Sequence, residues 1–257
     1  MQYILINILI LLSFCSCSEI TKKGEAQINK KTNISTSDTI TQDTALPDYP
    51  DLSKEYLLGK INPENDSMFV EIPSKYCIMR KEYIHKDVLE PFIAMYEAAE
   101  KDGIRLGIVS AHRTFETQKW LWNQRYYNSS NPVSVAKIVL NYLAMPGTSR
   151  HHWGTEVDLI STKLYYYESE EGKYTYQWLI DNAADYGFYQ VYTAGKTKGY
   201  NEEKWHWSYM PVAKEFLKQY GEKITYEDIS GFNGCETAKE LMIIENYVFG
   251  IDTLLLK

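Results

Sequence analysis

The chain has 257 residues, 44% of them apolar and 24% charged, which is the composition of a globular protein with one large domain or two small ones. Its formal net charge is −7, and it has no block rich in Lys or Arg. Both facts argue against a protein that binds nucleic acid non-specifically. Its 22 tyrosines and six tryptophans suit a groove that binds a polar polymer or a peptide, although ordinary packing accounts for most of them.

The N-terminal residues 1–14 are almost wholly apolar. This run is too short to span a bilayer comfortably and is typical of the apolar region of a secretory signal. It leads into Ser16-Cys17, a small residue before a cysteine, which resembles the lipobox of bacterial lipoproteins. We therefore expect a signal peptide over residues 1–17 and lipidation of Cys17, which would anchor the protein to a bacterial membrane. An ordinary cleaved signal would leave it soluble in the same compartment.

Residues 18–50 are rich in Thr, Ser, Lys, Asn and Asp and have no periodicity, which is typical of a flexible linker. Residues 51–257 contain no internal repeat and are interpreted as one domain. Cys77 and Cys235 lie within it. An exported location would permit a disulfide between them, and two free thiols are equally compatible with the sequence.

Within this domain, short strands and amphipathic helices alternate irregularly. Strands are expected over residues 105–111 and 155–160. Helices are expected over residues 88–101, 115–127, 133–143, 176–185, after Pro211, and over 236–248. Few strands without regular βαβ alternation predict an α+β fold, a small antiparallel sheet with helices packed on it.

The segment 149–158 reads Ser-Arg-His-His-Trp-Gly-Thr-Glu-Val-Asp. In an extended strand over residues 155–160, Glu156, Asp158 and Ile160 share one face and the intervening residues face the core. His151 comes from the loop before the strand, and Gly154 lets the backbone turn closely between them. Taken alone, a histidine and an aspartate at this spacing are usually a coincidence.

A second segment strengthens this interpretation. Glu203 and His206 are three residues apart, which places both on one side of a turn, and Trp205 and Trp207 flank the histidine and could enclose it. Two imidazoles and one carboxylate would hold Zn²⁺ with an open fourth position, as in catalytic zinc sites. A further carboxylate beside the site could act on bound water, which predicts a hydrolase.

The pattern Ser-x-His-x-x-Gly-x-x-x-Asp over residues 149–158, with Glu-x-Trp-His over residues 203–206, resembles the zinc D-alanyl-D-alanine carboxypeptidases and dipeptidases. These enzymes share a fold with the hedgehog signalling domain. Residues 110–118 are similar to a third block of the family, Ser-Gly-aromatic-Arg-Ser. The resemblance covers roughly residues 75–210, with three motifs in the same order.

The resemblance implies a role for each matching residue. One zinc ion per chain would be bound by His151, Asp158 and His206. Glu203 would activate a zinc-bound water as a base and then protonate the leaving amine. Arg113 would stabilise the oxyanion or bind the carboxylate of the peptide. The expected substrate contacts are Gln118, Ser149 and Tyr209.

The chain departs from the family pattern at several positions. Glu156 replaces the usual small residue and faces the same way as Asp158; it would either orient a metal ligand or add negative charge that weakens anionic substrates. Ser208 stands where Arg is common. His112 replaces an aromatic residue and is expected to pack or form hydrogen bonds. His152 and Glu202 are expected to be alternatives to His151 and Glu203 that the motif register disfavours, and His85 is expected on the surface.

The sequence therefore predicts a monomeric zinc metallopeptidase of the bacterial periplasm or cell surface, which removes the terminal D-alanine from peptidoglycan stem peptides. The alternatives are a D,D-dipeptidase, an L,D-carboxypeptidase or an endopeptidase of the same fold, and a zinc-bearing module that binds wall peptides without cutting them. Retention of Glu203 argues against the last, because a pure binding protein needs no base.

Overall fold

The computed structural model of the protein describes residues 49–256. The expected signal peptide, the lipidation site Cys17 and nearly all of the expected linker lie outside the described residues. Within the part that is described, none of the helices combines the length and the apolar character that crossing a membrane requires.

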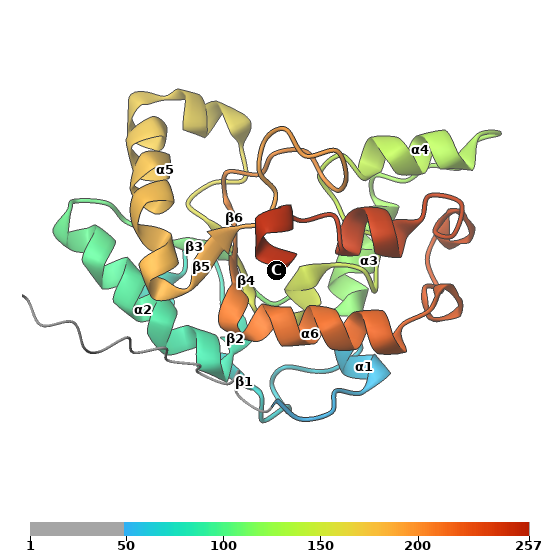
Figure 1. Ribbon diagram of the computed structural model, residues 1–257, viewed down its shortest axis with the longest axis horizontal. Coiled ribbons are helices and arrows are strands. Elements are labelled where there is room, and N and C mark those ends of the chain that lie inside the picture. Colours follow the sequence, from blue (N-terminus) through green and yellow to red (C-terminus); the bar gives the residue numbers. More distant parts are fainter. Residues whose placement is uncertain (1–48, 257) are drawn as a thin grey trace, which may run out of the picture. The chain divides into compact units, whose positions relative to one another are not determined.

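The centre of the fold is a four-stranded antiparallel sheet with the strand order β3-β4-β6-β5 (Figure 1). Its strands are β3 (Ile108–Ser110), β4 (Glu156–Leu159), β5 (Phe188–Gln190) and β6 (His206–Tyr209). A separate antiparallel pair is formed by β1 (Phe69–Glu71) and β2 (Tyr83–His85). The predicted α+β class, with a small antiparallel sheet, is confirmed.

Helices surround this sheet. They are α1 (Lys54–Leu57), α2 (Lys86–Lys101), α3 (Phe115–Asn123), α4 (Pro132–Val139), α5 (Glu170–Asn182) and α6 (Met210–Lys223). In Figure 1, α2 and α5 lie to the left of the sheet, α3 and α4 lie to its right, and α6 follows directly from β6.

Local capping explains where several helices begin. The Thr114 hydroxyl accepts a hydrogen bond from the Thr117 N–H at the start of α3, and Asn131 caps α4 in the same way, ahead of Pro132. The helix predicted from residue 88 stops at Asp102, as expected from the glycine that follows. These short-range signals are the ones that a sequence contains directly.

The helix predicted over residues 236–248 is wrong. The structure has a 3₁₀ turn at Cys235–Thr237 and a single π-helical turn at Ile244–Val248. Between them Met242 has a φ of 49°, which no continuous right-handed helix contains. Leu241, Ile243 and Val248 are nevertheless all buried, so the apolar pattern reports burial and not helical periodicity.

The strand predicted over residues 155–160 ends earlier, at Leu159. Ile160 has a φ of 65°, so it leaves the strand and does not share a face with Asp158. All four residues of β4 are buried, because the sheet is covered on both faces. Cys77 and Cys235 are free thiols, both half-buried.

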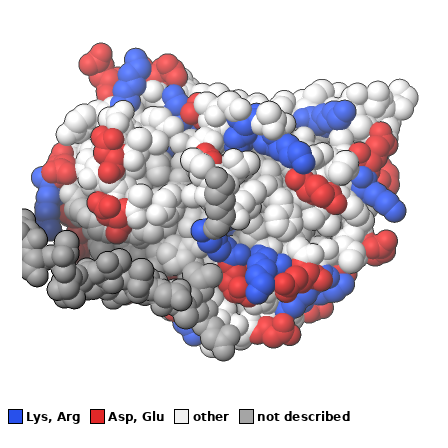
Figure 2. All heavy atoms as spheres, in the orientation of Figure 1, with Lys and Arg blue, Asp and Glu red and all other residues white. Residues whose placement is uncertain are grey.

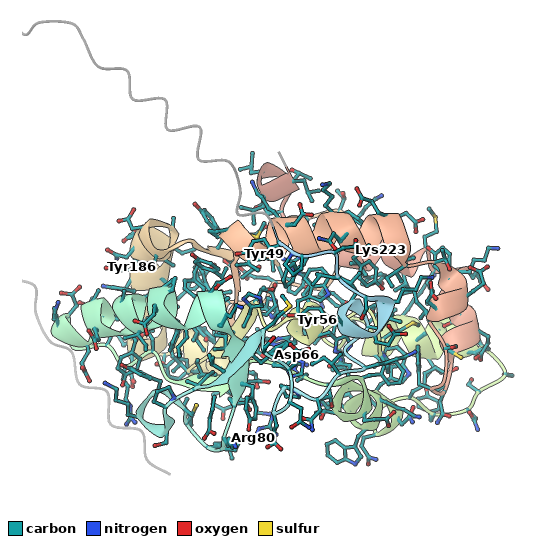
Figure 3. The ribbon with its side chains drawn as sticks, turned by 90° about the horizontal axis from the view of Figure 1, so that it is seen from below. Tyr49, Tyr56, Asp66, Arg80, Tyr186 and Lys223 are labelled. Atoms are coloured by element: carbon teal, nitrogen blue, oxygen red, sulfur yellow. The ribbon has the colours of Figure 1, made fainter. Side chains whose placement is uncertain are left out.

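The packed domain begins before residue 51. The ring of Tyr49, beside α6 in Figure 3, contacts Phe216 with ring centroids 5.5 Å apart. On the face drawn in Figure 2, acidic and basic side chains are interspersed and form no continuous basic patch.

The polar sequence around His85 predicts a surface residue. The structure contradicts this prediction. His85 is fully buried, its Nδ1 accepts a hydrogen bond from the Asp87 N–H at the start of α2, and its ring packs against Phe216. Burial lowers the pKa of His85 to about 4. It is therefore a neutral helix cap inside the core.

Because this folded-state pKa lies below the unfolded value of about 6.5, the unfolded chain binds the proton more readily, and stability is lost as the pH falls through this window. We expect His85 to remove about 2 kcal/mol of stability between about pH 7 and pH 5. His85→Asn keeps a cap acceptor without a titrating ring, so its free energy of unfolding should change less over this range. Urea denaturation at both pH values measures this, and an equal loss in the variant would contradict the assignment.

Candidate active site

Two neighbouring strands place the first polar side chains of the site. Asp158 on β4 lies directly opposite His206 on β6, and Glu156 lies opposite Ser208. Directly opposed residues in an antiparallel pair project to the same face, and residues two apart on one strand do so as well. The side chains of these two opposed pairs therefore lie together on one buried face of the sheet.

His151 reaches this face from the 3₁₀ turn Arg150–Trp153, which immediately precedes β4. Gly154 ends the turn with a φ of 70°. A Cβ at this position would lie 2.4 Å from the Phe69 ring and 2.9 Å from the His85 backbone nitrogen, so only glycine fits. The reversal at Gly154 lets His151 and Asp158 converge although they are seven residues apart.

Three potential ligand atoms converge in the site. His206 Nδ1 lies 3.1 Å from Asp158 Oδ1, and His151 Nε2 lies 3.2 Å from His206 Nδ1 and 3.3 Å from Asp158 Oδ1. A tetrahedral zinc ion with bonds of about 2.0–2.1 Å would hold its ligand atoms roughly 3.3 Å apart. The residues that the sequence selected therefore have the spacing of one face of a zinc tetrahedron.

The other nitrogen of each ring has its own partner. His151 Nδ1 lies 2.6 Å from the Ala111 carbonyl oxygen, so this nitrogen carries the proton and Nε2 presents a lone pair to the cluster. His206 Nε2 faces Glu156 Oε2 at 3.0 Å, which leaves Nδ1 toward the cluster. Both histidines are thus oriented as metal ligands, and the residues fit a zinc ion.

The electrostatic field between the three candidate ligands favours a bound cation. Burial lowers the pKa of His206, but its contacts with Asp158 and Glu156 outweigh burial and raise the pKa to about 9. Burial also raises the pKa of the Asp158 carboxyl, and the two histidines and Arg113 lower it well below its ordinary value. Asp158 is accordingly a carboxylate.

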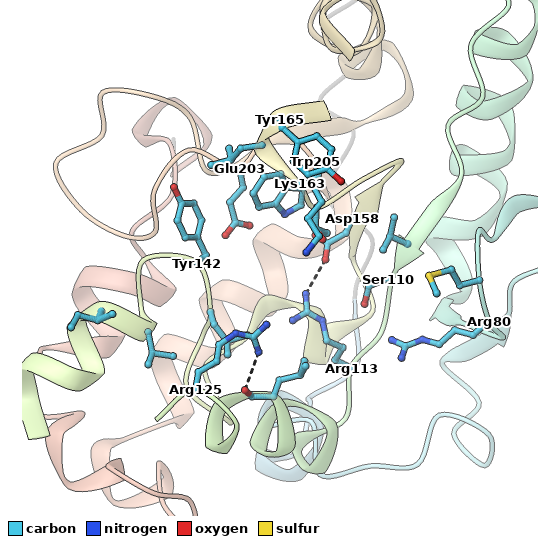
Figure 4. Close-up of a pocket in the computed structure, with 18 residues that line it drawn as sticks. Arg80, Ser110, Arg113, Arg125, Tyr142, Asp158, Lys163, Tyr165, Glu203 and Trp205 are labelled. Atoms are coloured by element: carbon cyan, nitrogen blue, oxygen red, sulfur yellow. Dashed lines mark hydrogen bonds and ion pairs between the residues drawn. The ribbon is translucent and has the colours of Figure 1, made fainter. Parts of the chain in front are cut away.

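Arg113 lies at the edge of the cluster. Its Nη2 donates to Asp158 Oδ2 at 3.0 Å (Figure 4). Its Nη1 donates to Gln118 Oε1 at 3.1 Å. Gln118 is fully buried and donates in turn to the Ala144 carbonyl oxygen at 2.8 Å. In this structure Gln118 fixes the guanidinium of Arg113 and does not line the cleft described below.

Glu203 precedes β6 in a tight turn that is closed by a hydrogen bond from the His206 N–H to the Glu203 carbonyl oxygen, 3.2 Å long. This is the bend that the spacing of the two residues predicts. Glu203 Oε2 lies 3.8 Å from His206 Nδ1, and burial raises the pKa of the Glu203 carboxyl to about 8. A carboxyl group with such a pKa, beside the metal position, can accept and return a proton near neutral pH.

Among the described residues, the other histidines lie outside the cluster of His151, Asp158 and His206. His152 Nδ1 donates to the Arg113 carbonyl oxygen at 2.7 Å, and its Nε2 accepts from the Gly147 N–H at 3.0 Å, so both nitrogens are used. His112 packs against Phe69 with ring centroids 4.5 Å apart. Burial lowers the pKa of both rings to about 3.

A cleft of about 930 Å³ opens in front of the cluster (Figure 4). Arg113, Asp158 and Glu203 line it, and Tyr142, Tyr165 and Trp205 supply aromatic surface. A separate cavity of about 30 Å³ shares Arg113, Tyr142 and Glu203 with the cleft. Its other lining residues are Ala144, Ser149, Arg150, His151, Tyr192, Tyr200 and His206.

The structure distributes the other expected residues unevenly. Ser149 lines the small cavity. Tyr209 and Trp207 follow His206 on β6 but alternate to the opposite face of the strand, so they do not enclose the site. Tyr192, which the sequence gave no reason to select, packs on His206 instead, with ring centroids 4.6 Å apart. Its position depends on the fold, and no motif marks it.

A family model described as "VanY: D-alanyl-D-alanine carboxypeptidase" matches residues 81–212, which include all of these site residues. The chain belongs to this family. The predicted family resemblance is confirmed.

The chain is also similar to individual proteins and to solved structures. The chain is 25% identical to a D-alanyl-D-alanine carboxypeptidase of Enterococcus faecalis over 62% of its own length and 60% of the relative, and 32% identical to the putative carboxypeptidase YodJ of Bacillus subtilis over 57% and 56%. It thus spans less than two thirds of these relatives. A solved Zn(II) complex of the D,D-pentapeptidase VanY is 24% identical with a TM-score of 0.44, covering 68% of this chain and 100% of that one.

The two adjacent histidines give a direct test of the ligand set. His151→Ala should reduce zinc affinity by more than about 100-fold, because one of three ligands is lost. His152→Ala should leave the affinity unchanged and reduce the free energy of unfolding by about 2–4 kcal/mol, because it removes two buried hydrogen bonds and leaves a cavity. Zinc titration and urea denaturation of both variants measure these effects. Loss of zinc by a folded His152→Ala variant would overturn the assignment.

Proposed function

We propose that this protein is a zinc-dependent D-alanyl-D-alanine carboxypeptidase that hydrolyses the terminal D-alanine from peptidoglycan stem peptides. The observation that carries the proposal is the convergence of His151, Asp158 and His206 next to Glu203, beside a cleft large enough for a peptide. Membership in the family of D-alanyl-D-alanine carboxypeptidases supports the choice of substrate.

Zinc is the metal that this donor set favours, because two imidazoles and one carboxylate form a three-ligand site with room for a fourth group. When bound, zinc supplies a Lewis acid that polarises a carbonyl group and acidifies water. The protein then has to position the peptide, move one proton and stabilise the negative charge that develops on the carbonyl oxygen.

Glu203 is placed to move the proton. Its carboxylate accepts a proton from the attacking water as the water oxygen bonds to the carbonyl carbon of the terminal peptide bond. When the carbon–nitrogen bond breaks, Glu203 returns this proton to the leaving amine of D-alanine. Its backbone is fixed on both sides, since its N–H donates to the Tyr192 carbonyl oxygen at 3.0 Å and its carbonyl oxygen accepts from Gln190 at 3.2 Å.

Arg113 is the cation that lines the cleft next to Asp158, one of the candidate metal ligands. It lines both the cleft and the small cavity and is held by Gln118 from behind. Its planar guanidinium can bind either the oxyanion or the C-terminal carboxylate of the peptide. The cleft of about 930 Å³ is large enough for the stem peptide.

The substrate also sets the location. Peptidoglycan lies in the cell envelope, and the apolar N-terminal segment with Cys17 supports export and lipid anchoring there. We propose that the protein acts as a monomer with one zinc ion, tethered to the membrane by a lipid on Cys17 and by the linker over residues 18–50.

Incubation of the zinc-loaded protein with purified pentapeptide muropeptides tests the function. Mass spectrometry should show loss of one alanine mass. Glu203→Gln should bind zinc normally and lose at least about 1,000-fold in rate, because the proton acceptor is gone. Glu202→Gln, one residue away, is the matched control and should remain active. An active Glu203→Gln variant would remove the central claim.

The same experiment separates the alternatives. Loss of two alanines indicates a dipeptidase, cleavage of tetrapeptides indicates an L,D-carboxypeptidase, and separation of cross-linked stems indicates an endopeptidase. An unchanged muropeptide, with binding detected by calorimetry, indicates a module that binds wall peptides without cutting them.

The cleft also predicts a preference for anionic peptides. Arg125 and Lys163 line it, and within residues 49–256 neither forms an ion pair with an acidic side chain. Arg125→Ala with Lys163→Ala should raise KM about 5–30-fold for a stem peptide with a free side-chain carboxylate, and leave kcat nearly unchanged. Steady-state kinetics with the amidated peptide is the control, since its KM should change little. Equal effects on both peptides would contradict this preference.

A further inference from the structure

Glu156 is the unusual charge of this site. It lies two residues before Asp158 on β4, on the same face of the sheet, and it is completely buried. A buried carboxylate is costly unless charged or hydrogen-bonding partners surround it. The partners of Glu156 therefore indicate what the side chain is for.

Its first oxygen is held by three groups. Glu156 Oε1 accepts hydrogen bonds from the Ser208 hydroxyl at 2.8 Å and the Thr155 hydroxyl at 3.1 Å, and Arg150 Nη2 lies 3.2 Å away. Arg150 also donates to Ser208 Oγ at 2.9 Å. These contacts fix both the position of the carboxylate and its rotation.

Its second oxygen faces a metal ligand. Glu156 Oε2 lies 3.0 Å from His206 Nε2, which is an ion-pair contact. Within residues 49–256 neither atom forms a hydrogen bond of regular geometry, so each atom has the other as its nearest oppositely charged group. His206 Nδ1, on the opposite side of the ring, is the atom in the ligand cluster. The proton of the imidazole is thus directed to Glu156 and the lone pair to the metal position.

Arg150 balances the charge. Its side chain is completely buried, and its guanidinium lies over the Trp153 ring, 4.9 Å from the centroid. Together Arg150 and Glu156 add no net charge beside the metal. Glu156 also lines neither the cleft nor the small cavity, so it is not placed to repel an anionic substrate.

We propose that Glu156 is a positioning residue for the metal centre: held by Arg150 and Ser208, it fixes the ring of His206 with Nδ1 toward the zinc ion. Of the two roles that the sequence left open, orientation of a ligand is the one that the contacts support. The proposal depends on the metal site of the proposed function but not on its substrate. Carboxylate partners of this kind typically change metal affinity 10–100-fold when removed.

The test compares two double variants that differ only in the contact with His206. The first double variant combines Arg150→Met with Glu156→Ala. It removes both charges of the buried ion pair, so that neither is left unpaired, and it removes the carboxylate that faces His206 Nε2. Arg150→Met with Glu156→Gln is the matched control, since the amide oxygen still accepts from His206. Zinc affinity is measured by competition with a chromophoric chelator. We expect the Ala variant to bind zinc about 10–100-fold more weakly than the wild type, with the Gln variant between them.

A second measurement excludes a purely structural effect. In the zinc-loaded wild type, ¹H–¹⁵N NMR of the histidine rings should show a slowly exchanging Nε2 proton on His206. This signal should shift in the Gln variant and broaden or vanish in the Ala variant. Equal zinc affinity and an unchanged His206 proton in all three proteins would overturn the proposal.

If neither double variant folds, the NMR signal of the zinc-loaded wild type carries the test. A slowly exchanging Nε2 proton on His206 supports the role of Glu156, and its absence would refute that role. Because both readouts concern metal binding, a chain that binds zinc as expected but cuts no muropeptide would refute the proposed function and leave this inference standing.

Discussion

The site depends on the register between β4 and β6. With Asp158 opposite His206 and Glu156 opposite Ser208, two of the candidate metal ligands and two of their neighbours lie on one buried face. A shift of one residue would turn these side chains to the other face of the sheet. The tight turn from Glu203 into β6 then fixes the carboxylate of the candidate base 3.8 Å from His206 Nδ1. One strand pairing therefore sets both the spacing of the candidate ligands and the position of the candidate base.

Around this pairing, each charge has a partner of opposite sign. Arg113 faces Asp158 at the edge that opens to the cleft, and Arg150 faces Glu156 on the closed side. Arg113 is partly exposed and can turn to a substrate, whereas Arg150 is sealed in the core. Because only Arg113 of the two is accessible from the cleft, it is the arginine that can bind a substrate, whereas Arg150 can only neutralise Glu156.

The site residues could be predicted largely from the sequence because their spacing is local. Gly154 allows a reversal between His151 and Asp158, and the separation of Glu203 and His206 fits a turn, so each half of the site is determined within ten residues. The helix starts after Thr114 and Asn131 depend on capping hydrogen bonds that are equally local. The strands around residues 69–71, 188–190 and 206–209 were not recognised, because three or four residues are too few to show a period.

The sequence by itself determined the family, the α+β class, the three candidate ligands and the base. Tertiary structure alone decided that His85 is a buried cap, that residues 236–248 do not form a helix, and that Tyr192, not Trp207, covers His206. It also supplies the contacts on which the proposed role of Glu156 rests. The physical reason is that a side chain's role depends on its neighbours in space, and Arg150, Glu156, His206 and Ser208 become neighbours only when β4 and β6 pair.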